Sequence, residues 1–407
     1  MRNQSGIKSV AAIFLCASLL LSSACKKEGS KEDVTSSLVL WGSQEEQVML
    51  KDMVAQFVGV HPKYTVEVKV MTDDQTLAEM QSDPDNAADV FSVTQDGLYS
   101  LSGQGLLLEN TESADSISTD CVPAALQAAT VDGKVYGYPI SGTTYVLYYD
   151  TSLFAPEDVM SLENILSISS TSGKVVGCNM SNNYYTSAFW FANGCKLFGA
   201  SGADPEGSSY NNESGLAAAN YIAGLRVAGL SNYSQDAALT AFADGTLCAQ
   251  IADGSAKYDF QEALGDNYGV ASLPTVAIDG ENKDLVSFSE IRLYAVNAKS
   301  DSSRAAMQLA TFLTNYSNQL TRYAKTGAIP VNVAAAADAT IASDATSSAI
   351  ATQLTDSVAM PVIPQKVNFW SAYSMSITLD IYNGMTTDYQ SALATWESLL
   401  KATVAAE

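Results

Sequence analysis

The sequence predicts an α/β fold with two lobes, each a mainly parallel sheet flanked by helices. The first observation is a rhythm in which short apolar segments, typical of buried strands, alternate with amphipathic helical segments. The second observation is that this rhythm starts again after Asp150. The third is length, because about 370 residues follow the N-terminal segment, which is more than one hydrophobic core usually holds.

Three strands and two helices carry the first part of this rhythm. We expect the strands at residues 38–41, 64–70 and 89–93. Ser43 and Glu46 have the spacing of a capping box, which predicts a helix start, and apolar residues recur on one face of that helix from Met49 to Phe57. A second helix is expected to begin within residues 77–81.

The same alternation continues after Asp150. We expect strands at residues 175–180 and 249–252 and helices at residues 187–198 and 214–228. Strands separated by helices in this order predict βαβ units, whose crossover helices cover the faces of a parallel sheet. Residues 334–349 are biased toward small side chains and fit either a helix or a loop.

The N-terminus has the pattern of a secretory signal. Positive charge precedes an uncharged apolar run at residues 10–21 that is too short to span a bilayer. Small residues then lead to Cys25, an ending that resembles a bacterial lipobox, in which residues 1–24 are removed and the cysteine is acylated. We therefore expect a lipid anchor on Cys25 and a flexible tether over residues 25–37. An ordinary cleaved signal with a chance cysteine is the alternative.

The composition argues against several kinds of partner. The chain has 44 acidic and 21 basic residues, which gives a net charge of −23 at pH 7. Such a charge opposes binding to nucleic acids and to anionic membranes, and it favours solubility outside the cell. After the N-terminal run, the sequence has no second apolar stretch long enough to predict a membrane span.

Most catalytic and metal chemistries lack the residues they need. His61 is the only histidine and lies beside Pro62 in an expected helix-to-strand turn, so a histidine triad or zinc site would depend on it alone. The cysteines after Cys25 lack metal-ligand spacing, although Cys178 and Cys195 could pair. No phosphate-binding loop and no GxSxG elbow occur. We expect no cofactor, no metal site and no catalytic residue.

The remaining chemistry is that of carbohydrate binding. Sugar rings stack their C–H faces on aromatic side chains, and their hydroxyls need carboxylate, amide or hydroxyl partners. The chain is rich in Tyr, Asn, Ser and Thr, and aromatic residues fall near expected strand ends. The best aromatic candidates are Trp41, Tyr145, Tyr184, Tyr185, Trp370 and Tyr373. Aromatic side chains are more often core than site, so chemistry alone predicts only a secreted α/β protein.

Five groups of segments then show a characteristic order along the chain. They are residues 38–42 (LVLWG), 88–96 with 105–107, 133–140 (GKVYGYPI) with 147–150, 242–251 with 267–275, and 361–370 (PVIPQKVNFW). Together they resemble the extracellular solute-binding proteins of ABC importers, in the maltose/maltodextrin-binding class. The resemblance runs from about residue 38 to about residue 394. It implies a two-lobed periplasmic-binding-protein-like fold with hinge crossings between the lobes.

The resemblance also implies which residues contact the ligand. Trp370 falls on a tryptophan that stacks on the sugar, and Tyr184 with Tyr185 falls on an aromatic pair that contacts it. Asp96 and either Glu45 or Glu46 fall on acids that bind sugar hydroxyls.

Four positions depart from the maltose-binding pattern. Thr143 and Asn182 stand where maltose-binding proteins have carboxylates. Ser374 stands where they have an arginine, and Ala256 stands near an expected tryptophan. Without one stacking tryptophan and several charged partners, a given sugar would bind differently. We therefore expect a site retuned relative to that of the maltose-binding proteins, and the identity of the sugar stays open.

The resulting prediction is a lipid-anchored, extracytoplasmic receptor that hands an oligosaccharide, of the maltose or maltodextrin type, to the permease subunits of an ABC transporter. It is expected to be monomeric and not an enzyme. Lobe one is expected at residues 38–143 and 281–328, and lobe two at residues 144–280 and 329–407. The alternatives are a secreted glycosidase-like enzyme, since many acids always allow some carboxylate pair, and a surface glycan sensor or adhesin without a transporter. Other solutes, such as arabinogalactan oligosaccharides or polyamines, also remain open.

Overall fold

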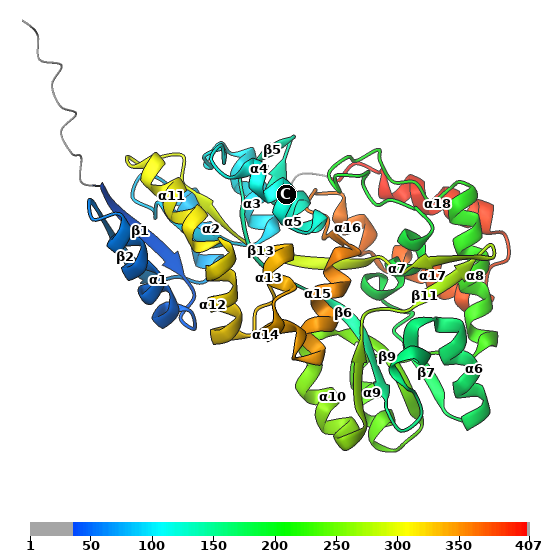
Figure 1. Ribbon diagram of the computed structural model, residues 1–407. Coiled ribbons are helices and arrows are strands. Elements are labelled where there is room, and N and C mark those ends of the chain that lie inside the picture. The colour runs from blue at the N-terminus through cyan, green and yellow to red at the C-terminus, as the bar shows by residue number, and fades with distance from the viewer. Residues whose placement is uncertain (1–35, 405–407) are drawn as a thin grey trace, which may run out of the picture. The chain divides into compact units, whose positions relative to one another are not determined.

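The computed structural model describes residues 36–404, whose strands form one ten-stranded sheet and two separate two-stranded pairs (Figure 1). The strands of the large sheet are β1 (Ser36–Gly42), β2 (Tyr64–Val70), β3 (Val90–Val93), β6 (Tyr138–Asp150), β7 (Val175–Cys178), β8 (Leu230–Asn232), β9 (Leu247–Asp253), β10 (Tyr268–Ala271), β13 (Ser287–Val296) and β14 (Ser357–Ala359). Their order is β2-β1-β3-β13-β6-β9-β7-β8, with β10 beside β6 and β14 beside β13. The short pairs are β4 (Thr130–Val131) with β5 (Lys134–Val135) and β11 (Thr275–Ile278) with β12 (Glu281–Asp284).

Helices connect these strands and cover both faces of the sheet. The helices before β7 are α1 (Gln47–Val60), α2 (Asp73–Ser82), α3 (Gln95–Gly103), α4 (Ala114–Asp120), α5 (Pro123–Ala129), the 3-10 helix η1 (Pro156–Met160) and α6 (Leu162–Ser172). Those between β7 and β13 are α7 (Asn183–Ala192), α8 (Glu213–Ala228), α9 (Gln235–Ala243), η2 (Gly254–Ala256), α10 (Lys257–Leu264) and η3 (Gly265–Asn267). Those after β13 are α11 (Ser303–Leu313), α12 (Tyr316–Thr326), α13 (Val333–Ala336), α14 (Ala339–Ala342), α15 (Ala345–Thr355), α16 (Lys366–Phe369), α17 (Ala372–Asn383) and α18 (Tyr389–Leu400).

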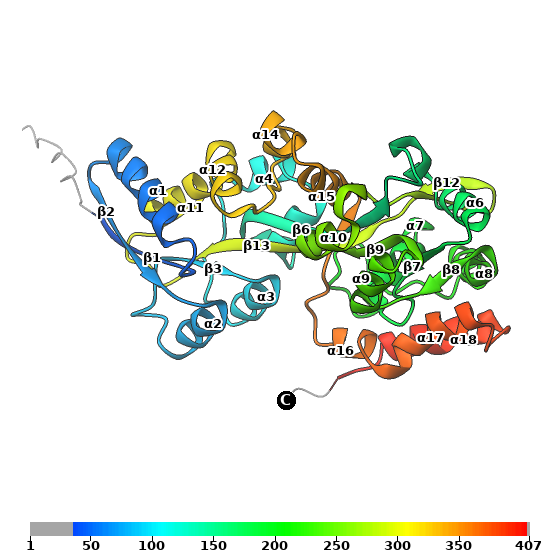
Figure 2. The same cartoon turned by 90° about the horizontal axis from the view of Figure 1, so that it is seen from below.

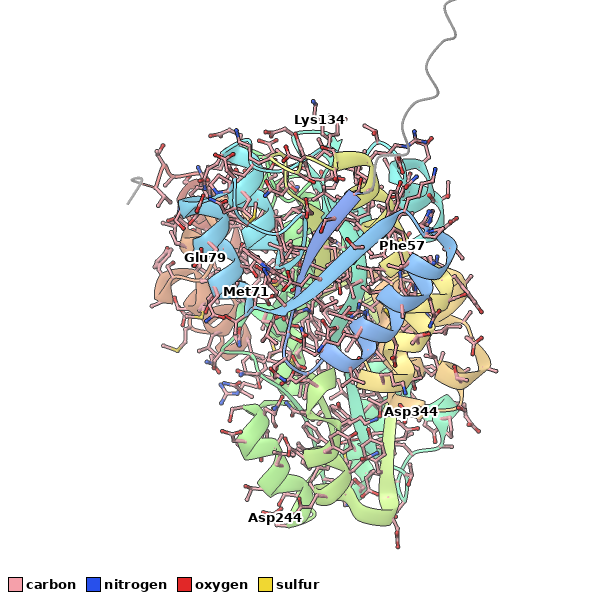
Figure 3. All side chains as sticks on the ribbon, turned by 90° about the vertical axis from the view of Figure 1, so that its left-hand side faces the viewer. Phe57, Met71, Glu79, Lys134, Asp244 and Asp344 are labelled. Atoms are coloured by element: carbon pink, nitrogen blue, oxygen red, sulfur yellow. The ribbon has the colours of Figure 1, made fainter. Side chains whose placement is uncertain are left out.

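The covering of the sheet is clearest around β1 and β3. Figure 2 shows α1, α11 and α12 on one face of this part of the sheet and α2 and α3 on the other. Figure 3 places Phe57 of α1 and Glu79 of α2 on opposite sides of the edge strand β2. At both ends of the sheet the pairing is parallel, between β1 and its neighbours β2 and β3 and between β7 and its neighbours β8 and β9. The predicted α/β architecture is confirmed, but the sheet is mixed, because β13 pairs antiparallel with β3 and β6 pairs antiparallel with β9, β10 and β13.

Strands β6 and β13 run antiparallel to each other and connect the two ends of the sheet. β6 pairs with β13 from Tyr138 to Thr144, and with β9 from Tyr145 to Tyr149. All residues of β6 are buried except Thr143, which is half-buried. A strand that changes partner midway belongs to both groups of strands, so we call β6 and β13 the crossing strands.

Apolar side chains of the described residues form three clusters along the sheet. One joins β1 and β3 to α1 and α11 and includes Leu40 and Phe57. Another joins β7 and β9 to α7, α8, α17 and α18, where the rings of Trp190 and Trp396 meet with centroids 5.4 Å apart. A third joins α3, α5, α9, α10 and α15 to the sheet, and all three clusters include residues of both crossing strands. The crossing strands therefore link the clusters at the two ends of the sheet, as the predicted two-lobed fold with hinge crossings requires. The residue boundaries of the lobes stay a prediction.

Most predicted elements are confirmed, and the differences lie at helix ends. The five predicted strands correspond to β1, β2, β3, β7 and β9, and the helix predicted at 214–228 is α8. Helix α2 begins at Asp73, before the predicted 77–81. Helix α7 spans Asn183–Ala192 rather than 187–198. It starts early because Asn182 caps it by accepting a hydrogen bond from the Tyr184 backbone N–H at 2.9 Å. Residues 334–349 are mostly helical, in α13, α14 and the start of α15.

The capping box predicted at Ser43 and Glu46 is wrong. Helix α1 begins at Gln47, and no side chain of the described residues caps it. The Glu46 carboxylate forms an ion pair with Arg322 of α12 instead. The apolar face predicted from Met49 to Phe57 is buried as expected.

Two further sequence features have a plain structural outcome. The cysteines within residues 36–404 are free thiols, so Cys178 and Cys195 do not pair, and both are buried. His61 lies at the C-terminal end of α1, in the predicted helix-to-strand turn, where its ring stacks on Tyr64 with centroids 5.4 Å apart. Within the described part of the chain, no helix combines the length and apolar character that a membrane crossing needs. The predicted signal and Cys25 lie outside the described residues.

Candidate functional site

A cavity of about 660 Å³ lies where the crossing strands meet the surrounding loops. Residues 94–96 at the start of α3, the η2–α10 turn, residues 326–329 and one face of α15 complete its lining. Most of the lining side chains are small or carry a hydroxyl. Among the residues from 36 to 404 that line the cavity, Tyr258 is the only aromatic one, and it is 72% exposed.

The crossing strands contribute four polar side chains to this cavity, which we call the cavity floor. Ser141 and Thr143 come from β6, and Glu290 and Arg292 come from β13. The strands pair so that Glu290 lies opposite Thr143 and Arg292 lies opposite Ser141. Residues two apart on a strand point to the same face of the sheet. Glu290 and Arg292 therefore share one face of β13, and they are the two exposed residues of an otherwise buried strand. The floor therefore presents two hydroxyls, one carboxylate and one guanidinium side by side.

The charged side chains of the lining differ in whether they have a partner. Three are paired with an opposite charge: Arg292 with Asp73 at 3.0 Å, Asp96 with Lys366 at 2.5 Å, and Lys257 with Asp344 at 3.6 Å. The side chain of Glu290 makes no hydrogen bond or ion pair with any residue between 36 and 404. Burial, and then the negative charge of Asp253, raise the pKa of Glu290. Glu290 is therefore the uncommitted carboxylate of the lining.

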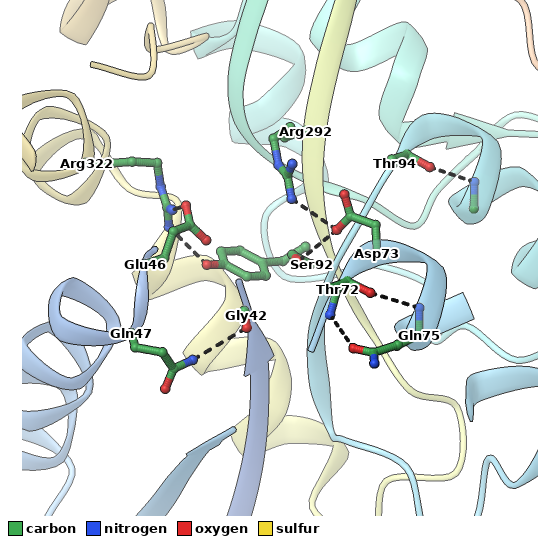
Figure 4. A network of polar contacts seen from close by, with 12 residues as sticks. Gly42, Glu46, Gln47, Thr72, Asp73, Gln75, Ser92, Thr94, Arg292 and Arg322 are labelled. Carbon is green, nitrogen blue, oxygen red and sulfur yellow. Dashed lines mark hydrogen bonds and ion pairs between the residues drawn. The ribbon is translucent and has the colours of Figure 1, made fainter. Parts of the chain in front are cut away.

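A polar network lies beside the cavity at the carboxyl ends of β1 and β3 (Figure 4). Arg322 of α12 is 1% exposed and forms an ion pair with Glu46. It also donates a hydrogen bond of 3.0 Å to the hydroxyl of Tyr294 on β13. Burial alone would lower the pKa of Arg322, but Tyr294 and Glu46 together raise it. This network commits Glu46 to a structural partner.

Two of the predicted site residues line the cavity, and a third shares their surroundings. Thr143 is part of the floor and Asp96 lies at its side, where Lys366 neutralises it. Tyr184 lies within electrostatic range of Glu290, because the charges of Asp253 and Glu290 add to burial in raising its pKa. The hydroxyl of Tyr184 is buried and has no hydrogen-bond partner among the described residues.

The other predicted aromatic residues pack against one another. Tyr184 and Tyr185 both make edge contacts with the ring of Tyr145, at centroid distances of 4.9 and 5.2 Å. Tyr145 is fully buried, and its hydroxyl accepts a hydrogen bond of 3.3 Å from the Phe288 backbone N–H. Trp370 is partly exposed and packs edge-on against Phe369 at 4.6 Å. Their roles as ligand contacts stay predictions.

The remaining predicted site residues lie away from the cavity lining. Trp41 is 6% exposed and belongs to an apolar cluster, while Glu45 is exposed at the surface. Asn182 caps α7. Ser374 is fully buried and accepts a hydrogen bond of 2.8 Å from the indole N–H of Trp396. In this arrangement the cavity does not collect these four side chains.

Sequence reasoning missed Glu290, Arg292, Lys257 and Tyr258, which line the cavity. For the first two a signal was present. The segment SFSEIRLYAV is apolar enough for a buried strand, yet it carries two charges at alternate positions. Such a pattern predicts one polar face within a central strand, and a polar face there marks a site.

The lining can hydrogen-bond to a polar ligand from several sides. Hydroxyls donate and accept, the carboxylate accepts, and the guanidinium donates. Within residues 36–404, no group of three His, Cys, Asp or Glu side chains could hold a metal ion. The chemistry of the cavity is therefore that of directional hydrogen bonding.

Comparison with known proteins identifies the family and the relatives of this chain. The family model of the bacterial extracellular solute-binding proteins matches residues 52–349. The galactooligosaccharide-binding protein of Bacillus subtilis is 28% identical, over 89% of this chain and 90% of its own length. A maltooligosaccharide ABC transporter solute-binding lipoprotein of Streptococcus pneumoniae is 27% identical, over 78% and 77% of the two chains. The structure of a maltodextrin-binding protein from L. casei covers 91% of this chain and 100% of its own, with 26% identity and a TM-score of 0.78.

Proposed function

Because the chain belongs to the family of bacterial extracellular solute-binding proteins, we propose that it captures an oligosaccharide and delivers it to the permease of an ABC transporter. The observation that carries this proposal is the cavity of about 660 Å³ above the crossing strands. Its floor offers the hydroxyl, carboxylate and guanidinium groups that hydrogen-bond to sugar hydroxyls. The volume lies within the usual range for small-molecule sites.

The proposed ligand is of the maltose or maltodextrin type. Relatives named for maltooligosaccharides and maltodextrin support this choice, as does the similarity to the L. casei protein. A galactooligosaccharide is the second candidate, because the 28% identical relative from Bacillus subtilis is named for that ligand.

Capture would work through closure of two lobes around the ligand. We propose lobe one at residues 38–143 and 281–328 and lobe two at residues 144–280 and 329–407. The crossing strands contribute to both lobes, so a ligand on the cavity floor lies at the hinge. A ligand that contacts both lobes only when they close stabilises the closed state, and that state would be the one the permease recognises.

The protein would work outside the cytoplasm, held to the membrane by acyl chains on Cys25. The support is the N-terminal signal pattern that ends at Cys25, and residues 25–37 would then serve as a tether. The Streptococcus pneumoniae relative is named a lipoprotein. Replacing Cys25 by Ala should move the protein from the membrane fraction to the soluble fraction and remove the mass of the acyl chains. An unchanged fractionation and mass would contradict the anchor.

The proposed receptor is monomeric and releases its ligand unchanged. Its relatives are named as binding proteins, and this supports a receptor over the glycosidase-like alternative. A surface sensor would share the same cavity but would lack a transporter. Genes for two permease subunits beside the gene for this chain would favour the importer.

Calorimetry on the mature protein tests this function. We expect saturable one-to-one binding of maltotriose or maltotetraose, with a galactooligosaccharide as the competing ligand. At a free ligand concentration of about 100 times Kd, binding should raise the unfolding free energy by about 2.7 kcal/mol, which a thermal-shift measurement detects. Chromatography should recover the sugar intact. Protein-dependent release of monosaccharide would favour the glycosidase, and no binding of any neutral oligosaccharide would reject the proposal.

A further inference from the structure

The acids around the cavity differ in whether a cation pairs with them, and of the two acids that line it, Asp96 is paired and Glu290 is not. Asp96, Asp73 and Glu46 each form an ion pair with a lysine or arginine. A carboxylate held by a cation has given up part of its acceptor capacity. The Glu290 carboxylate keeps all of it, because it makes no hydrogen bond or ion pair with any residue from 36 to 404.

The position of Glu290 on the cavity floor is set by the pairing of the crossing strands. Its neighbours on β13 are buried, while Glu290 itself projects into the cavity with Thr143 directly opposite on β6. Directly opposed residues of antiparallel strands have Cβ atoms about 4.5–5.5 Å apart. A carboxylate and a hydroxyl therefore meet any ligand that rests on this part of the floor.

The electrostatic surroundings of Glu290 leave its charge uncompensated. The groups that face it are Asp253 at the end of β9, Tyr184 on α7, and its strand neighbour Arg292, which is engaged by Asp73. The other charges of the lining, Lys257 and Asp96, are engaged by Asp344 and Lys366. Burial and the charge of Asp253 raise the pKa of Glu290, and the hydroxyl of Tyr184 is buried without a partner among the described residues.

We propose that Glu290 is the carboxylate that accepts hydrogen bonds from the hydroxyls of the bound oligosaccharide. This inference rests on the proposed function, and it names the charged side chain that holds the ligand in the same cavity. In the empty cavity the exposed carboxylate of Glu290 lacks a cation, and partial burial together with the charge of Asp253 disfavours its charged form. Sugar hydroxyls donate to it and remove that penalty, so Glu290 favours the bound state and disfavours the empty one.

The test compares Glu290→Gln with the wild-type mature protein. Calorimetry with maltotetraose should show binding that is about 10- to 100-fold weaker in the variant, the range expected when a hydrogen bond to a charged group is lost. Thermal unfolding of the ligand-free variant should occur at the same or a higher temperature, because the unpaired charge is gone. The matched control is Glu281→Gln on the exposed strand β12, which should change neither quantity by much.

The pH dependence provides a second readout. The sugar binds the deprotonated form of Glu290, so affinity should be constant above its raised pKa and should fall as the pH drops through that pKa. The Glu290→Gln protein should lack this fall. The double variant Glu290→Thr with Thr143→Glu, which moves the carboxylate across the strand pair, should recover part of the affinity that Glu290→Thr alone loses.

The possible outcomes separate this inference from the proposed function. If the wild type binds no neutral oligosaccharide, both are overturned. If the wild type binds and Glu290→Gln binds equally well, only the role of Glu290 is overturned. A variant that loses affinity and also melts many degrees lower would assign Glu290 a structural role and would equally overturn the inference.

Discussion

The first two helices that the structure describes, α1 and α2, begin differently at the same edge of the sheet (Figure 4). Helix α1 follows β1, and the Glu46 carboxylate at its start forms an ion pair with Arg322 of α12. Helix α2 follows β2 and begins with a capping box. There, Thr72 Oγ1 accepts from the Gln75 backbone N–H at 3.3 Å, and Gln75 Oε1 accepts from the Thr72 backbone N–H at 3.1 Å.

The two starts have nearly the same local pattern, a hydroxyl residue followed three positions later by Glu or Gln. A capping interaction contributes about 1 kcal/mol, whereas a hydrogen bond to a charged group contributes about 1.5–3 kcal/mol. The charged Glu46 therefore turns to the buried Arg322, while the neutral Gln75 stays with its own helix. A local motif forms only where no stronger tertiary partner competes for its side chain.

Removing the arginine should have the largest effect. Arg322→Met leaves the Glu46 carboxylate, which is 15% exposed, without its cation. We expect the unfolding free energy to fall by about 3–5 kcal/mol in urea denaturation. The double variant Arg322→Met with Glu46→Leu removes both charges and should recover most of the loss. A fall below about 1 kcal/mol in the single variant would show that α1 does not depend on the pair.

A third helix start, that of α17, combines a local cap with a tertiary partner. Ser371 caps the helix by accepting from the Ser374 backbone N–H at 3.2 Å, and the Ser374 hydroxyl accepts from the Trp396 indole N–H. Ser374→Ala leaves that buried indole N–H unpaired and should lower the unfolding free energy by about 1–3 kcal/mol. Ser376→Ala on the same helix should stay within about 0.5 kcal/mol. Weaker sugar binding with unchanged stability would instead support the ligand role predicted for Ser374.

Breaking the capping box should have a smaller effect. Thr72→Ala removes the acceptor for the Gln75 backbone N–H and should lower the unfolding free energy by about 1 kcal/mol. Ser43→Ala, at the matching position before α1, should change it by less than about 0.5 kcal/mol, because Ser43 is not the cap. Urea denaturation of both variants measures the difference. Equal losses would mean that Ser43 acts as a cap in solution.

The exposed pair Asp96–Lys366 should have the smallest effect. Its side chains are 59% and 28% exposed, so solvent screens this ion pair. The Glu46–Arg322 pair, by contrast, is largely buried. Lys366→Gln should lower the unfolding free energy by less than about 1 kcal/mol, and high salt should abolish the difference. Melting temperatures at low and high salt test this. A loss that persists at high salt would mean that Lys366 supports the fold by packing.

The sequence by itself predicted the parts of this protein that depend on neighbouring residues. Strand and helix positions, the apolar face of α1 and the turn at His61 follow from periodicity and local chemistry, which act over a few residues. Asp96 and Thr143, which line the cavity, were identified through the family resemblance and not through local chemistry. Exact helix starts were less accessible, because Asn182 and Thr72 are common polar residues and only the helix geometry makes them caps.

Only the tertiary structure decided which of the acidic and aromatic candidates face the cavity. Glu46 meets Arg322 across 276 positions of sequence, and no local pattern encodes that meeting. Tyr145 looks like a platform in the sequence but is enclosed by Tyr184 and Tyr185 once α7 packs on β6. Only the pairing of β13 with β6 in the folded structure showed that Glu290 lies opposite Thr143. The physical reason is that the burial and pairing of charges depend on segments that are distant in the sequence and come together only when the chain folds.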